Sequence, residues 1–171
     1  MKKGFLFTLF ILSVLAGAAQ KYGHINFGNL VASMPETKKA DEDLKVFRDG
    51  LVKDGEVKLK AFEEKYAQAV KDVQEGKLSP LQQQQRQQEL EKEQQELQVL
   101  EQDILQKVEA KRQELLKPII DRATKSIEDV AKENGYLLIF DSSVFNAVLF
   151  LQPEDDILAL AKKKLGLEEG K

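Results

Sequence analysis

The stretch from Glu75 to Leu90, EGKLSPLQQQQRQQEL, decides how this chain folds. It lies between two long charged segments that carry apolar residues at helical spacing. Gly76 favours the end of the first helix, because glycine adopts the left-handed backbone of a helix C-terminus without strain. Ser79 and Pro80 favour a new start, since serine caps a helix and proline fits its first position. The stretch therefore predicts the turn of a helical hairpin.

Apolar stripes with steps of mostly three and four residues predict the two helices of this hairpin. The first stripe consists of Ala40, Leu44, Phe47, Leu51, Leu59, Phe62, Tyr66, Ala69 and Val73. The second consists of Leu90, Leu97, Leu100, Ile104, Val108, Leu115, Ile119, Ala123, Ile127 and Val130, and Gly135 is its expected end. Helices of this length reach roughly 60 to 80 Å. We therefore expect an arm over 36–134 that no small domain could bury.

Three residues interrupt the predicted arm and are interpreted as hinges: Gly50, Gly55 and Pro118. A glycine inside a helix lowers its stability by about 1 kcal/mol, and Gly55 lies where the first stripe skips a step. Pro118 lacks the N–H that a helix interior uses, so it predicts either a simple kink or a joint between the arm and the rest of the chain.

Short apolar segments on either side of the arm predict a small β body over 22–35 and 135–171. Tyr22–Phe27 alternates like a strand, while Tyr136–Leu151 holds two apolar runs and predicts a hairpin of two buried strands. A last helix over 155–165 could cover one face of this three-stranded sheet. The other face is also apolar, which predicts self-association. The predicted core and contact residues are Ile25, Phe27, Leu137, Ile139, Val148 and Phe150.

The first nineteen residues predict an export signal that is removed near Ala19. Lys2 and Lys3 precede the uncharged run Phe5–Ala16, and small residues follow. The run is shorter than the ~20 residues that a membrane-spanning helix needs. Residues 20–171 then form a single domain, and because the chain has no cysteine, its stability cannot rest on disulfides.

Residue types that carry chemistry are scarce. The chain has no cysteine and a single histidine, His24, which excludes a thiol nucleophile and a two-histidine zinc site. No glycine-rich phosphate loop is present. With 26 basic and 29 acidic residues, the chain has no overall charge that favours nucleic acid. The sequence therefore predicts neither an enzyme nor a bound cofactor or metal.

In the order of its elements, the chain resembles the Skp/OmpH family of periplasmic chaperones. Three stretches carry the resemblance: GHINFGNLVASMPETKKADEDLK at 23–45, LLKPIIDRATKSIEDVAKENGYLLIFDSS at 115–143, and AVLFLQPEDDILALAKKKLGL at 147–167. The resemblance implies a fold that is mainly α with a small three-stranded β body. It also implies a homotrimer in which the body holds three arms around a central cavity.

The activity that the resemblance implies is capture of unfolded outer-membrane β-barrel proteins without ATP. The apolar residues toward the outer half of the arm are the predicted client contacts, although packing within the hairpin is the alternative for each: Phe62, Tyr66, Val73, Leu78 and Leu81. Residues 65–88 hold four basic and two acidic residues, unlike strongly basic family members, so binding of lipopolysaccharide or a membrane surface is in doubt. The competing interpretation is a coiled-coil adaptor of the cell envelope that binds one folded partner.

Overall fold

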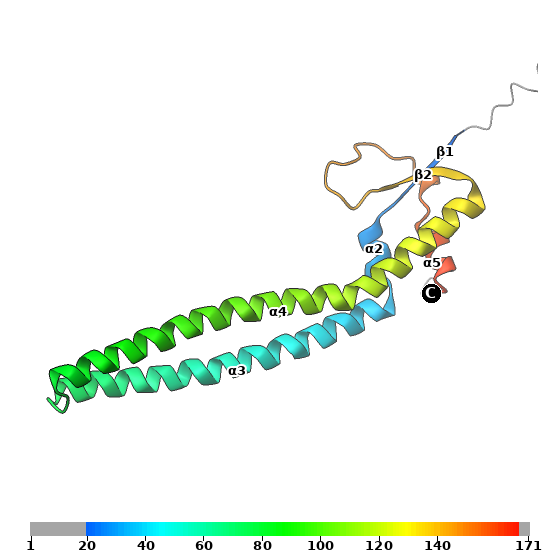
Figure 1. The fold of residues 1–171 in the computed structure, drawn as a ribbon. Coiled ribbons are helices and arrows are strands. Elements are labelled where there is room, and N and C mark those ends of the chain that lie inside the picture. Colours follow the sequence, from blue (N-terminus) through cyan, green and yellow to red (C-terminus); the bar gives the residue numbers. More distant parts are fainter. Residues whose placement is uncertain (1–19, 168–171) are drawn as a thin grey trace, which may run out of the picture. The chain divides into compact units, whose positions relative to one another are not determined.

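The computed structural model describes residues 20–167, and the predicted export signal lies outside them. Figure 1 shows the elements, which are β1 (Lys21–Ile25), α2 (Phe27–Ala32), α3 (Pro35–Gln74), α4 (Pro80–Asn134), β2 (Tyr136–Asp141), the 3-10 turn η1 (Pro153–Asp155) and α5 (Leu158–Lys164). Within this part of the chain, no helix combines the length and the apolar character that crossing a bilayer requires.

The described residues divide into two compact units. The arm consists of Pro35–Ile119, and the body consists of 20–34 and 120–167. The division falls inside α4, directly after Ile119, which follows Pro118. Residues 120–134 therefore group with the body although they continue the same helix.

The arm is the helical hairpin that the sequence predicts, and its turn is built as expected. Gly76 has a φ of 68°, and the Lys77 N–H donates to the Asp72 carbonyl at 2.9 Å. At the start of α4, the Ser79 N–H donates to Gln82 Oε1 at 2.9 Å, and the Gln82 N–H donates to Ser79 Oγ at 3.4 Å. This reciprocal capping box satisfies N–H groups that a helix start leaves open.

The two helices of the arm run antiparallel along their length (Figure 1). A methyl group placed on Gly55 would lie 3.5 Å from Ile104 Cδ1, and farther along the arm Lys65 Nζ lies 2.6 Å from Glu93 Oε1. Residue numbers therefore rise along α3 as they fall along α4. Gly50 and Gly55 lie inside an uninterrupted α3, so their role as hinges stays a prediction.

The body contains a parallel pair of strands in place of the expected three-stranded sheet. Within residues 20–167 the sheet consists of β1 and β2, with Gly23 opposite Ile139 and His24 opposite Phe140. The prediction of a third strand over 147–151 is wrong for a single copy of the chain: Leu149 is 91% exposed and Phe150 is 76% exposed. A run that is apolar on both faces needs cover on both faces, and one copy does not supply it.

A second correction concerns Phe27, which was expected on the first strand. The strand ends at Ile25, and the side chain of Asn26 accepts a hydrogen bond from the Asn29 N–H at 2.8 Å. This N-cap starts α2, so Phe27 is the first residue of a short helix.

The core of the body is small and is formed by residues from both ends of the chain: Ile25, Leu30, Met34, Ala123, Val130, Ile157 and Ala161. Gly23 is needed at its centre, because a methyl group there would lie 2.9 Å from the Tyr136 ring and 3.3 Å from Ile157. Lys164 of α5 also pairs with Glu133 of α4, and this hydrogen bond raises the pKa of Lys164 above its usual value.

Candidate functional site

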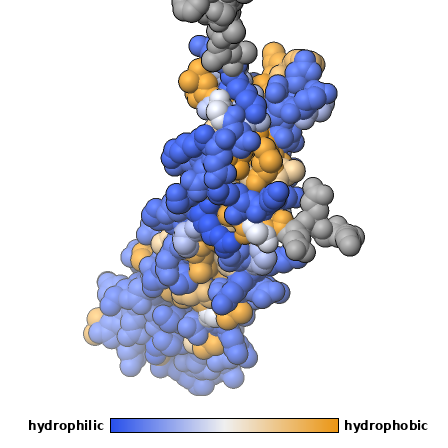
Figure 2. Space-filling view, turned by 90° about the vertical axis from the view of Figure 1, so that its right-hand side faces the viewer, coloured by the Kyte–Doolittle hydropathy of each residue, from blue (hydrophilic) through white to orange (hydrophobic). Residues whose placement is uncertain are grey.

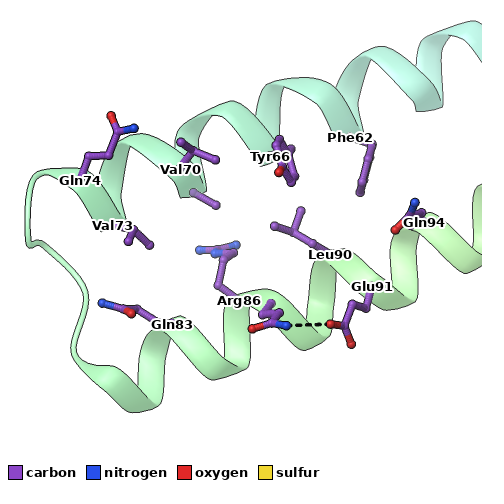
Figure 3. A pocket seen from close by; sticks show the side chains of 12 residues that line it. Phe62, Tyr66, Val70, Val73, Gln74, Gln83, Arg86, Leu90, Glu91 and Gln94 are labelled. Carbon is purple, nitrogen blue, oxygen red and sulfur yellow. Dashed lines mark hydrogen bonds between the residues drawn. The ribbon is translucent and has the colours of Figure 1, made fainter.

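A concave surface of the arm lies next to the hairpin turn, and we call it the tip groove. It has a volume of about 610 Å³. It is lined by Phe62, Tyr66, Ala69, Val70, Val73 and Gln74 of α3 and by Gln83, Arg86, Gln87, Leu90, Glu91 and Gln94 of α4. Figure 3 shows Leu90 between the two helices, close to Tyr66, and Val73 pointing toward Arg86.

A mismatch between the two helices opens this groove. The apolar stripe of α3 continues to Val73, near the turn, whereas α4 begins with a glutamine tract and its stripe starts only at Leu90. By the register of the Gly55–Ile104 and Lys65–Glu93 contacts, Val73 lies opposite the glutamine tract, and both Val70 and Val73 stay more than a third exposed. Tyr66 is 55% exposed, and its ring lies 6.3 Å from the ring of Phe62.

A second hollow of about 590 Å³ continues this surface along the arm, and we call it the middle groove. It is lined by Val52, Gly55, Leu59, Phe62, Gln94, Leu97, Gln98, Leu100, Glu101, Ile104 and Leu105. Phe62 and Gln94 line both grooves, so the two form one strip of partly uncovered apolar surface. The missing side chain of Gly55 helps to open the middle groove opposite Ile104.

The charges in the tip groove are balanced. Arg86 Nη1 lies 3.1 Å from Glu89 Oε2, and Gln87 Nε2 donates to Glu91 Oε1 at 2.9 Å. Arg86 and Glu91 are the charged residues of the lining. The groove therefore has no net charge that would select an acidic or a basic ligand.

Three of the five predicted client contacts come together in the tip groove: Phe62, Tyr66 and Val73. Leu78 and Leu81 do not line it. Leu78 lies in the turn, where its carbonyl accepts a hydrogen bond from Gln83 Nε2 at 3.1 Å, and Leu81 is 65% exposed. Sequence reasoning missed Val70, although its spacing of four residues from Tyr66 and three from Val73 was a usable signal.

The predicted contact residues of the body differ in exposure. Ile25 is buried, Phe27, Ile139 and Val148 are partly buried, and Leu137 and Phe150 are exposed. Ile25, Phe27, Leu137 and Ile139 line a hollow of about 320 Å³ together with residues of α4. Figure 2 shows apolar patches that interrupt a largely hydrophilic surface.

Two polar groups of the body hold its loops. Asp141 Oδ1 accepts hydrogen bonds from the Phe27 N–H at 3.2 Å and the Ser143 N–H at 2.8 Å. Burial raises the pKa of Asp141, but the hydrogen bonds from Ser143 and Phe27 outweigh it, so the pKa lies below its ordinary value. His24 Nε2 donates to the Gln152 carbonyl at 2.8 Å. In the part of the chain that the structure describes, no cluster of acidic or histidine residues could hold a metal ion.

Comparison with known proteins finds a matching family model and similar solved structures. The model of the family described as outer membrane protein (OmpH-like) matches residues 21–165. The crystal structure of an OmpH-like outer membrane chaperone from Caulobacter crescentus CB15 has a similar fold, with a TM-score of 0.68 and 18% sequence identity. The match covers 89% of this chain and 86% of that one. No curated protein matches the chain in sequence.

Proposed function

The chain belongs to the OmpH-like family of outer membrane proteins, and on that basis we propose that it is a periplasmic holdase that binds unfolded outer-membrane proteins without ATP. The observation that carries this proposal is the strip of uncovered apolar surface formed by the tip groove and the middle groove. A hairpin that served only as a spacer would pack these side chains against each other.

The physical basis of the proposed activity is weak, multiple contact. Unfolded β-barrel proteins expose apolar side chains and unpaired strand edges, which makes them aggregate. Shallow grooves that bind such segments lower the concentration of free unfolded chain by mass action. They also release it when folding elsewhere is more favourable, so no nucleotide is required.

We further propose that the chain works as a homotrimer held together by its body, with the arms around a shared cavity. Support comes from the apolar residues that one copy leaves exposed on β2 and in the loop after it: Leu137, Leu138, Phe140, Phe145, Leu149 and Phe150. Closed symmetry is the common way in which soluble proteins bury such a surface. Neither nucleic acid nor a cofactor has a part in this proposal.

The test is dilution of a urea-unfolded outer-membrane β-barrel protein into buffer with and without residues 20–171. Light scattering follows aggregation, and native mass spectrometry gives the stoichiometry of any complex. We expect suppressed scattering and a complex of one client with three chains. Unchanged scattering at an excess of folded protein would contradict the holdase function and favour the adaptor interpretation.

Variants of the groove sharpen this test. Val70→Ser and Val73→Ser together should weaken the suppression of aggregation, because they make the floor of the tip groove polar without filling it. Val99→Ser is the matched control, since Val99 is an exposed valine of the same arm that lines neither groove. Equal suppression by both variants would exclude the tip groove from client binding.

A further inference from the structure

Four glutamine side chains surround the apolar floor of the tip groove: Gln74, Gln83, Gln87 and Gln94. Gln83 and Gln87 each use an amide N–H within the chain, donating to the Leu78 carbonyl and to Glu91, which leaves their amide oxygens as acceptors. Among residues 20–167, the side-chain amides of Gln74 and Gln94 have no hydrogen-bond partner. The groove thus offers both donors and acceptors beside an apolar surface.

The dimensions of the groove fit a short extended peptide. From Phe62 to Val73 the helix rises roughly 16 Å, and an extended chain covers that distance with about five residues. The volume of about 610 Å³ lies within the range of protein ligand sites. Figure 3 shows the groove lying along the two helices, with Gln74 and Gln83 toward the turn and Gln94 at the other end.

The chemistry of the lining favours an uncharged chain in extended conformation. Arg86 and Glu91 carry opposite charges and both have partners on α4. An α-helix satisfies its own backbone groups and would leave the glutamine amides without partners. An extended segment presents free N–H and C=O groups along its edge, and a primary amide can pair with either.

We propose that the tip groove binds uncharged, extended polypeptide segments by their main chain. The peptide groups of the bound segment form hydrogen bonds with the amides of Gln74, Gln83, Gln87 and Gln94, and its apolar side chains pack on Tyr66, Val70 and Val73. This inference rests on the proposed holdase function and specifies which part of a client is bound. Because every residue except proline carries the same main-chain N–H and C=O groups, such a site tolerates many client sequences. Alternation of apolar and polar side chains suits it best, since one face of the segment lies on the floor and the other faces water.

The probe for this inference is a fluorescein-labelled peptide of ten residues, alternating threonine and valine and blocked at both ends. A second peptide carries N-methyl groups on alternate residues, which removes main-chain donors and leaves the side chains unchanged. Fluorescence anisotropy with residues 20–171 measures both affinities. We expect the methylated peptide to bind about ten-fold more weakly, the effect of losing one or two hydrogen bonds.

The matching protein variant is Gln74→Met with Gln94→Met, which keeps side-chain length and helix propensity but removes the amides. It should also bind the unmodified peptide about ten-fold more weakly. The control is Gln84→Met with Gln88→Met, because these glutamines lie in the same tract as Gln83 and Gln87 but line neither groove. The control should bind like the parent protein.

The outcomes separate this inference from the holdase function. If the parent protein keeps the β-barrel client soluble but its peptide affinity is unchanged by N-methylation and by the Gln74 and Gln94 variant, main-chain recognition is wrong while the holdase function stands. If the chain fails to suppress aggregation yet shows both affinity losses, the groove is a peptide site and the holdase function is wrong. A change of oligomeric mass in that variant alone would make the groove a contact between copies and overturn the inference.

Discussion

Asp141 shows how much one side chain can organise in a body this small. Its carboxylate joins the end of β2 to the start of α2 by accepting the Phe27 N–H, and it also accepts the N–H of Ser143 in the following loop. A charged acceptor makes such bonds roughly twice as strong as a neutral one. The lowered pKa of Asp141 follows from these hydrogen bonds.

Asp141→Asn keeps an acceptor oxygen but removes the charge, so we expect it to destabilise the body by about 1 kcal/mol at pH 7. A carboxyl whose pKa is lowered by folding contributes stability above its unfolded pKa of about 3.9, and this stability is lost as the pH falls through the folded value. The difference from the parent protein should therefore shrink below about pH 4. The protection factor of the Phe27 amide in hydrogen exchange measures this difference in stability. Glu154→Gln, a change at an exposed carboxylate, should show neither effect.

The glycines of the arm differ in what an added methyl group would meet. Gly50 has no atom within 4 Å of that position and has a helical φ, so Gly50→Ala should stabilise the arm by about 0.5 to 1 kcal/mol. Gly76→Ala should destabilise it by about 1 to 2 kcal/mol, because alanine at a φ of 68° is strained. Thermal unfolding, monitored by circular dichroism, compares each variant with the parent protein. A lower melting temperature for Gly50→Ala would mean that the arm needs a glycine at this position.

Among the elements, α4 is unusual because it crosses from one unit into the other beside Pro118. Proline supplies no N–H, so the carbonyl of Glu114 lacks the helical partner it would otherwise have. We expect this turn to open more readily than the rest of α4. Pro118→Ala should slow amide exchange around residues 114–118, whereas Val99→Ala should leave it unchanged. If the amides of residues 114–118 in the parent protein exchange as slowly as those in the rest of α4, a hinge at Pro118 is ruled out.

The arm could be predicted from sequence because the residues that define it act locally. Gly76 and Ser79 fix the ends of the two helices by their own backbone and side-chain chemistry. The strand expected around Phe150 failed because strand pairing depends on cover from distant residues or from other chains. The rim of the tip groove was missed for another reason: Gln83 and Gln87 belong to a tract of glutamines with no distinguishing pattern, and only the packing of α3 against α4 reveals which of them face the groove.

For the whole molecule, the exposed apolar loop after β2 gives a direct test of assembly. Leu149→Asp with Phe150→Asp should reduce the assembly to smaller species in sedimentation velocity, because each charge would be buried without a partner in a contact between copies. Val99→Asp introduces the same charge at an exposed valine of the arm and should leave the mass unchanged. An unchanged mass in the double variant would show that the proposed trimer does not use this loop.

The parallel pairing of β1 with β2 also sets an order of events during folding. The whole of α3 and the whole of α4 lie between the two strands, and closing an unstructured loop of that length costs about 4 kcal/mol in chain entropy beyond a constant term. Helical contacts between neighbouring residues form within microseconds and shorten the distance that remains to be closed. We therefore expect the hairpin to form first and the sheet last. During synthesis from the N-terminus, β1 stays unpaired until β2 has been made up to Asp141. The protein itself therefore passes through a state with an unpaired strand, like that of the clients proposed for it.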